Sequence, residues 1–159
     1  MDKLIRILSE NSNYTLSELA LMLGEKEEEI SSRIKEYEKS GIIKGYRAII
    51  NYEEVDNSGV TAYIELKVTP QKEKGFDEIA EKIMGFEEVS SVYLMAGTYD
   101  LALIVKGDTI QDISSFVSRK LSALDGILST ATHFILKRYK DDGVILTDMP
   151  EDERRCMQF

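Results

Sequence analysis

The sequence predicts an α+β fold built from two domains, and three features lead to that class. Residues 2–40 place apolar side chains at helical spacing in three short segments. From residue 60 onward, segments with strand and helix periodicity follow in the order β-α-β-β-α-β, which is the ferredoxin-like arrangement. Charged residues with Ser58 and Gly59 separate the two regions. We therefore expect an N-terminal helix-turn-helix domain, winged-helix-like in class, at 1–51, a linker at 52–59, a βαββαβ domain at 60–147 and a tail at 148–159.

Composition narrows the function classes. The formal net charge of −9 argues against a general nucleic-acid coat, because phosphate contact needs a basic surface, but it does not exclude a local basic face. The single cysteine, Cys156, permits no internal disulfide, and the single histidine, His133, permits no His-rich metal site. We expect neither an enzyme nor a resident metal or cofactor. No apolar run reaches the ~20 residues of a membrane span and no signal peptide is evident, so we expect a cytoplasmic protein without membrane contact.

The N-terminal region is predicted to form three helices. The first covers residues 2–10, the second opens at a Thr15-x-x-Glu18 capping box and stops at Gly24, and the third covers residues 27–40. The tight connection between the last two favours a helix-turn-helix, with an ordinary three-helix bundle as the alternative. The residues expected to face inward are Leu4, Ile5, Ile7 and Leu8, then Leu16, Leu19, Ala20 and Leu23, then Ile30, Ile34 and Tyr37.

The third helix carries the candidate DNA-binding residues. Steps of about 100° per residue place Ser31, Ser32 and Lys35 opposite its apolar stripe, where they can face a major groove. Arg33 lies at the flank of that stripe, where a guanidinium can reach a backbone phosphate. These four residues form the predicted DNA contact.

The charged residues of the third helix and the segment after it have opposite effects on DNA binding. Residues 33–47 contain five basic and two acidic side chains, so the acidic chain carries a local basic patch. The run Glu27–Glu29 in the first helical turn opposes it. Carboxylates at that position favour the helix dipole, but they repel DNA phosphates.

The C-terminal region is predicted to hold four strands and two helices. The expected strands are 60–68, 89–95, 99–106 and 127–136, and the expected helices are 74–84 and 109–124, the second capped by Asp108. Two further strands are expected outside this unit, at 45–51 and 144–146. Both helices cover one face of the sheet, and dimerisation is the economical way to cover the other. We expect that open face to carry Thr61, Tyr63, Thr130 and Thr132.

A turn between the two middle strands is the candidate ligand site. Asp100 is a single carboxylate at the mouth of an apolar strand, shortly after Gly97. This placement is more typical of a small-ligand site than of plain scaffold.

Several motifs together resemble one known family. The helix-turn-helix head with Leu19-Ala20 and Arg33-Ile34, the stretch from Gly41 to Tyr46, and Gly97-Thr98-Tyr99-Asp100 between the middle strands resemble the Lrp/AsnC family, also called feast/famine regulators. The likeness covers roughly residues 4–136. It implies a regulator of transcription that binds double-stranded DNA, pairs as a homodimer and often assembles further to octamers.

The resemblance also implies an effector, usually an amino acid, bound between dimers near the Gly-x-x-Asp turn. On this chain Gly97 and Thr98 would allow close backbone approach, and Asp100 would accept from an α-ammonium group. Thr130 and Thr132 on the last strand are the candidates for the carboxylate end. Ser31, Ser32 and Lys35 match base- or phosphate-facing positions of the recognition helix, with Arg33 on phosphate.

The chain departs from the family pattern at the start of the third helix, where Lys26 replaces the usual Ser or Thr cap. With Glu27–Glu29, this motivates a second hypothesis, an amino-acid-binding oligomeric sensor with weak or lost DNA binding. Acylphosphatases and RNA-recognition domains share the βαββαβ fold and stay as minor alternatives. The sequence lacks a Gly-rich phosphate loop for the first, and Tyr63 and Tyr99 are too few aromatic residues for the second. His133 falls mid-strand and is expected to be packed or at an interface.

Overall fold

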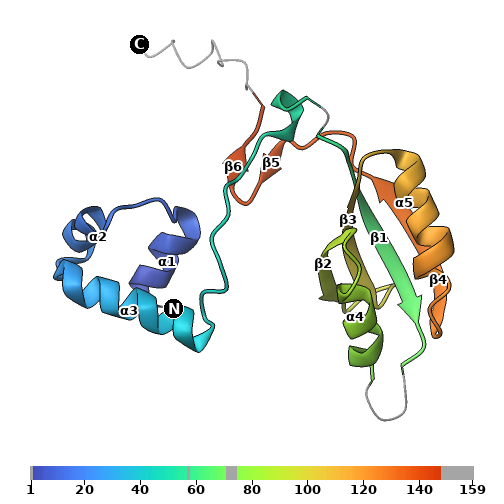
Figure 1. The fold of residues 1–159 in the computed structure, drawn as a ribbon, viewed down its shortest axis with the longest axis horizontal. Coiled ribbons are helices and arrows are strands. Elements are labelled where there is room, and N and C mark those ends of the chain that lie inside the picture. The colour runs from blue at the N-terminus through green and yellow to red at the C-terminus, as the bar shows by residue number, and fades with distance from the viewer. Residues whose placement is uncertain (1, 57, 71–74, 148–159) are drawn as a thin grey trace, which may run out of the picture. The chain divides into compact units, whose positions relative to one another are not determined.

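The computed structural model describes residues 2–56, 58–70 and 75–147 of the 159-residue chain. It divides after Ile49 into two compact units, an N-terminal helical head and a C-terminal unit containing a sheet (Figure 1). This confirms the predicted α+β class. The elements are α1 Lys3–Glu10, α2 Leu16–Leu23, α3 Glu27–Ser40, η1 Tyr52–Glu54, β1 Val60–Val68, α4 Asp77–Met84, β2 Val89–Leu94, β3 Leu101–Gly107, α5 Ile110–Phe116, η2 Val117–Leu121, β4 Ile127–Phe134, β5 Lys140–Asp141 and β6 Val144–Ile145.

The first two head helices begin at residues that satisfy their free backbone groups. At the start of α1 the Asp2 carboxylate accepts from the Leu4 N–H at 2.7 Å. Thr15 and Glu18 form the predicted capping box of α2, in which each side chain accepts from the other residue's backbone N–H. Gly24 ends α2 with φ 68°, a left-handed conformation that suits a residue without a Cβ. The short turn that follows leads into α3 and completes the helix-turn-helix pattern.

The head has a small core. One fully buried side chain comes from each helix, and these are Leu4, Leu19 and Ile30. The partly buried residues packed around them are Ile7, Leu8, Tyr14, Ala20, Leu23, Ile34 and Tyr37. The helical stripes predicted from the sequence are therefore largely confirmed. Leu16 differs, since as the first residue of α2 it is exposed.

The segment after the head does not form the predicted strand. Residues 45–51 pair with none of the described strands, and a strand without a ladder partner has no hydrogen bonds to hold it extended. Tyr52–Glu54, predicted as linker, instead form the 3₁₀ turn η1. The Asn51 side chain caps this turn by accepting from the Glu53 N–H at 3.2 Å, and its amide donates to the Leu146 carbonyl at 2.8 Å.

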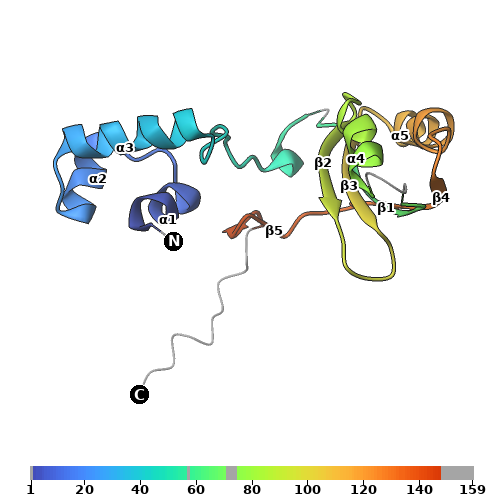
Figure 2. The same cartoon turned by 90° about the horizontal axis from the view of Figure 1, so that it is seen from below.

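The C-terminal unit is an antiparallel sheet with strand order β2-β3-β1-β4, the ferredoxin-like arrangement predicted from the sequence. Helices α4 and α5 lie on the same side of this sheet (Figure 2). Their buried residues pack on one row of strand side chains. That row consists of Ala62, Ile64, Leu66, Val68, Leu101, Leu103 and Val105.

The helix after β3 starts and ends differently from the prediction. Thr109, not Asp108, is its N-cap, because Thr109 and Asp112 form a reciprocal capping box. The α-helix ends at Phe116 and continues only as the π turn η2, so it stops short of the predicted end at residue 124. The predicted start of α4 at residue 74 lies outside the described residues, and the described helix begins at Asp77.

The strand register decides which residues share a face. Leu66 pairs with Thr130 and Ile64 pairs with Thr132, and partners across neighbouring strands point to the same side. Thr130 and Thr132 therefore lie on the helix-covered face, and the prediction that they line the open face is wrong. Tyr63 pairs with His133 on the opposite face, which Thr61 shares, as predicted. The open face also carries Glu65, Lys67, Tyr93, Ala102, Ile104, Lys106, Ser129 and Ala131.

The apolar run after residue 143 is not an edge strand of the main sheet. Strands β5 and β6 pair only with each other, in a separate two-stranded ribbon. The turn between them has positive φ at Asp142 and at Gly143, as a tight type I′ hairpin requires. This turn geometry agrees with the sequence interpretation of Asp141–Gly143 as a turn.

Gly59 is a position where the fold requires glycine. Its φ is +73°, and a Cβ there would lie 2.7 Å from the carbonyl oxygen of Gly107. We expect Gly59→Ala to lower the free energy of unfolding of the C-terminal unit by about 1–3 kcal/mol, since both strain and a backbone clash oppose it. Thermal unfolding of the ligand-free protein measures this. Gly97→Ala is the matched control, because a Cβ at Gly97 meets nothing within 4 Å; equal midpoints for the two variants would contradict the prediction.

Candidate functional site

The exposed face of α3 presents the predicted DNA-contacting residues. Ser32 and Lys35 are exposed and Ser31 is partly exposed, while Ile30 on the other side of the helix is fully buried. The helix begins after Lys26, whose side chain makes no capping hydrogen bond. Ser31, Ser32 and Lys35 therefore lie on the solvent side, as the helical spacing predicted.

Arg33 is already engaged within the head. Its guanidinium donates to Glu25 at 2.5 Å and to both carboxylate oxygens of Asp2 at 2.8 and 2.7 Å, and Asp2 also accepts from the Tyr37 hydroxyl at 2.8 Å. The hydrogen bond to Glu25 is the largest cause that raises the pKa of Arg33 above its ordinary value. Hydrogen bonds from Tyr37 and from the Leu4 N–H lower the pKa of Asp2. Arg33 thus ties the start of α1 to α3.

The acidic run at the start of α3 has a structural component. The Glu27 carboxylate accepts from the Ser17 hydroxyl at 2.5 Å, which joins the first turns of α2 and α3. Glu28 and Glu29 are exposed in the same first turn. One of the three carboxylates therefore has a role in packing the helix-turn-helix, and two remain at the solvent surface.

The turn between β2 and β3 is fixed by three hydrogen bonds around Asp100. The Met95 N–H donates to the Asp100 carbonyl at 2.8 Å, and the Asp100 N–H donates to the Leu66 carbonyl at 2.9 Å. The Asp100 side chain also accepts, through Oδ2, from the Val68 N–H at 2.9 Å. This last bond lies beyond Leu66–Leu101, the last pair between β1 and β3, so the carboxylate satisfies a β1 backbone group that the β3 ladder no longer reaches.

Gly97 and Thr98 lie at the tip of this turn and are exposed. A Cβ on Gly97 would contact nothing, and its φ is not in the left-handed region, so the protomer's own fold does not require glycine there. Leu94 and Met95, which lead into the tip, are also exposed apolar residues. The turn therefore combines an exposed backbone, an apolar flank and the half-buried carboxylate of Asp100.

A pair of tyrosines connects this turn to the open face of the sheet. The hydroxyls of Tyr99 and Tyr63 lie 2.5 Å apart, with the rings edge to face at 6.4 Å. That hydrogen bond, with partial burial, raises the pKa of Tyr63 to about 12. His133 follows at 6.4 Å from the Tyr63 ring, and its Nε2 lies 3.7 Å from Glu65. The sequence interpretation placed Tyr63 on the open face and considered Tyr63 and Tyr99 together only as RNA-stacking residues, so their mutual hydrogen bond was missed. Their places before β3 and on β1 were the available signal.

The structure brings together only part of the predicted effector set. Gly97, Thr98 and Asp100 share one turn. Thr130 on β4 pairs with Leu66 from one side of β1, and the Asp100 N–H donates to the Leu66 carbonyl from the other side, so β1 lies between the two residues. Two strand spacings separate them, roughly 10 Å. Thr132 lies further along β4, so within one protomer the two threonines do not line the turn.

Comparison with known proteins identifies the family. Residues 61–145 match the model of the Lrp/AsnC ligand-binding domain. The chain is 46% identical, over 153 residues, to the HTH-type transcriptional regulator YugG of Bacillus subtilis, covering 96% of this chain and 92% of that protein. The chain belongs to the Lrp/AsnC family. A second Lrp/AsnC relative, the HTH-type transcriptional regulator LrpA of Pyrococcus abyssi, is 34% identical over 140 residues, 87% of this chain and 96% of that one.

A solved structure of a bacterial transcriptional regulator has the same fold. A transcriptional regulator of Neisseria meningitidis, crystallised in complex with L-methionine, superposes with a TM-score of 0.69 at 27% identity and covers 89% of this chain and 93% of that one. The Lrp/AsnC relatives are transcriptional regulators and not enzymes, which confirms the expected class.

Two further expectations concern the described part of the Lrp/AsnC chain. Among residues 2–56, 58–70 and 75–147, no cluster of three or more His, Cys, Asp or Glu side chains could hold a metal ion. None of the helices within these ranges is long and apolar enough to cross a membrane.

Proposed function

We propose that this Lrp/AsnC protein is a sequence-specific DNA-binding regulator whose activity responds to an amino acid bound at the Gly97–Asp100 turn. The observation that carries the proposal is the Asp100 carboxylate. Its Oδ2 is held by the Val68 N–H, while Oδ1 accepts no hydrogen bond from the described residues. A carboxylate fixed by one oxygen presents the other in a defined direction, which suits an α-ammonium group.

An amino acid is the effector class we favour for this turn. The Neisseria meningitidis regulator of the same fold was crystallised with L-methionine. The apolar residues Leu94 and Met95 beside the turn match an apolar side chain. We assign the close backbone approach to Gly97 and Thr98. A role for Thr130 and Thr132 in holding the carboxylate end requires those threonines to come from another copy of the chain or to be reached across β1.

Assembly follows from the open face of the sheet. Tyr93 is 52% exposed, and Tyr63 and Ile104 are partly exposed, so a protomer alone leaves aromatic and aliphatic surface in water. We propose that two copies pair through this face as a homodimer, and that dimers meet near the exposed turns, up to an octamer. The Tyr99–Tyr63 hydrogen bond would then connect the effector turn to the dimer face.

For DNA, we propose that Ser31, Ser32 and Lys35 on α3 contact the double helix. Arg33 was predicted to bind phosphate, but its guanidinium is held by Asp2 and Glu25, so we assign it the task of fixing α3 against α1. The head then corresponds to the predicted domain 1–51, joined by 52–59 to the effector and oligomerisation domain 60–147.

Lys35→Gln is expected to weaken DNA binding and to make it less dependent on salt. Removing one phosphate contact lowers the slope of log K against log salt by about 1 per head in contact. Fluorescence anisotropy on the DNA upstream of the protein's own gene, repeated across salt concentrations, measures the slope. Lys82→Gln is the control, because Lys82 is a surface lysine of α4 paired with Glu78. An unchanged slope for Lys35→Gln would remove this residue from the interface.

The exposed Glu28 and Glu29 favour a second candidate, an amino-acid-binding oligomeric sensor with weak or lost DNA binding. The two candidates differ in one experiment. A thermal-shift screen over amino acids detects the effector, since a ligand that binds only the native state raises the unfolding midpoint. A shift without salt-sensitive DNA binding at any accessible protein concentration favours the sensor.

A further inference from the structure

A cleft lies at the other end of β1 from the Asp100 turn. It has a volume of about 240 Å³ and is lined by η1, by the residues leading into β1 and by the chain that follows β4. Clefts for drug-sized ligands occupy roughly 300–1,000 Å³, so this one fits a smaller molecule. Thr61 lines the cleft and Val68 meets Asp100, so the two sites are separated by roughly 20 Å of extended strand.

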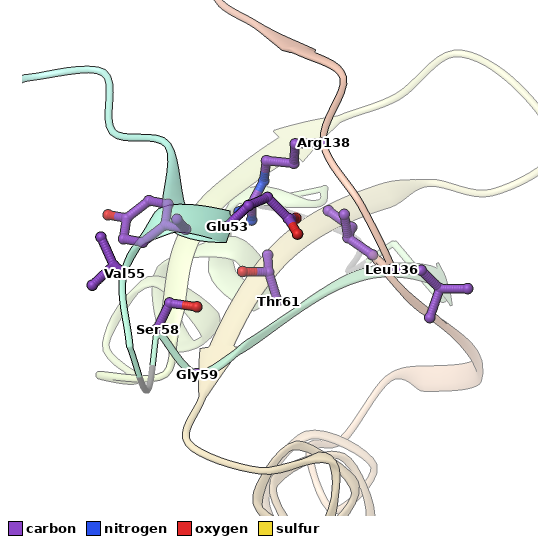
Figure 3. A pocket seen from close by; sticks show the side chains of 9 residues that line it. Glu53, Val55, Ser58, Gly59, Thr61, Leu136 and Arg138 are labelled. Atoms are coloured by element: carbon purple, nitrogen blue, oxygen red, sulfur yellow. The ribbon is translucent and has the colours of Figure 1, made fainter. Parts of the chain in front are cut away.

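The charged groups of this cleft have opposite signs and reach it from different elements. Glu53 comes from η1 and Arg138 from the segment after β4, and Figure 3 shows their side chains converging above Thr61. Among the residues that the structure describes, neither the Glu53 carboxylate nor the Arg138 guanidinium has a hydrogen bond or an ion pair. Two opposite charges that face one cleft without pairing are suited to a ligand that carries both.

The position of Arg138 is set by an aromatic ring. Its guanidinium carbon lies 5.7 Å from the centre of the Tyr52 ring, and Nζ of Lys106 lies 5.0 Å from the same centre. Such cation–π contacts orient a guanidinium and leave the N–H donors at its edge free to bind a ligand. Leu136, which is 92% exposed, supplies apolar surface at the rim.

We propose that this cleft is a second binding site for a small zwitterion of the amino-acid class, separate from the Asp100 turn. The Arg138 guanidinium donates to the ligand carboxylate, and the Glu53 carboxylate accepts from its ammonium group. Because the cleft is built partly from η1, in the segment that joins the head to β1 in sequence, a bound ligand restrains that segment.

Isothermal titration of the full chain with L-methionine tests the site. Binding at the Asp100 turn is first disabled with Asp100→Asn, and the remaining binding is compared with that of the double variants that also carry Glu53→Gln or Arg138→Gln. We expect each double variant to bind at least about tenfold more weakly, the loss that removal of one charged hydrogen-bond partner gives. The control is Lys137→Gln, which removes a neighbouring positive charge that does not line the cleft.

Two analogues test the zwitterion itself. L-methionine methyl ester lacks the carboxylate and N-acetyl-L-methionine lacks the ammonium group, and both are expected to bind the Asp100→Asn protein at least about tenfold more weakly than L-methionine. The inference is overturned if Asp100→Asn abolishes all binding of L-methionine, or if the cleft variants bind it with unchanged affinity. It is also overturned if either analogue binds the Asp100→Asn protein as tightly as L-methionine does. The same variants in the wild-type background give a second measure, a fall from two ligands per chain to one. If instead the Asp100→Asn protein binds L-methionine like wild type, the site proposed at the Asp100 turn fails and the cleft stands.

Discussion

Replacing Ile30 by alanine is expected to unfold the head and to leave the C-terminal unit folded. Within residues 2–49 of the head, three side chains are fully buried, Leu4, Leu19 and Ile30, one from each helix. Truncating a buried isoleucine costs about 2–5 kcal/mol. At roughly 0.05–0.15 kcal/mol per residue, a unit of this size has only a few kcal/mol of stability in total. One substitution therefore removes most of it.

Two measurements follow the outcome of Ile30→Ala. Far-UV circular dichroism should lose helical signal at 25 °C while the sheet unit keeps its thermal transition, and DNA binding should disappear with the head. Ile42→Ala is the matched control, since Ile42 is the same residue type in the same unit but 62% exposed. If both units melted together in Ile30→Ala, the head would depend on the sheet unit for its stability, and the division after Ile49 would not be a thermodynamic one.

The parts of the fold that the sequence predicted are those fixed by local chemistry. The capping box of Thr15 and Glu18 and the stop at Gly24 depend on residues within one turn of each other, and both were predicted. The strand Val60–Val68 alternates apolar and polar residues, so its buried face was also evident. The segment 45–51 has a similar composition, but no strand of the described residues pairs with it, and a strand exists only with a partner.

The face of β4 could not be determined from its own residues. Ile127, Ser129 and Ala131 alternate with Leu128, Thr130 and Thr132, so both faces mix apolar and polar side chains. A shift of one residue then reverses every side chain at little apparent cost. The register with β1 and its bulge at Lys67/Val68 settle the matter, and neither can be seen in the sequence of β4.

In the candidate sites, too, local features could be predicted from the sequence and contacts between distant segments could not. The exposed face of α3 followed from helical periodicity, so Ser32 and Lys35 were placed correctly on the solvent side. The ion pair of Arg33 with Asp2 was missed because Asp2 lies 31 residues away in the chain, and no local pattern links the two residues. The Asp100 turn was located from its sequence, but its bond to the Val68 N–H depends on a neighbouring strand.

The hydrogen bond from the Val68 N–H to the Asp100 carboxylate makes two substitutions at Asp100 informative in different ways. Asparagine keeps a side-chain oxygen that can accept from the Val68 N–H, but it removes the charge. Alanine removes both. We therefore expect Asp100→Asn to leave the unfolding midpoint of the ligand-free protein nearly unchanged, and Asp100→Ala to lower the free energy of unfolding by about 1–3 kcal/mol, the cost of an unsatisfied buried backbone group.

Effector binding at the turn should respond to both substitutions equally. If Asp100 accepts from an α-ammonium group, loss of the charge costs about 1.5–3 kcal/mol, or roughly 10- to 150-fold in affinity for L-methionine at this site. Titration calorimetry and the ligand-induced thermal shift measure it, with Asp108→Asn, an exposed carboxylate after β3, as the control. A purely structural Asp100 predicts the opposite pattern: Asp100→Asn would bind L-methionine like the wild type, and only Asp100→Ala would fail. The asparagine variant thus separates a carboxylate that binds the effector from one that only closes the end of β1.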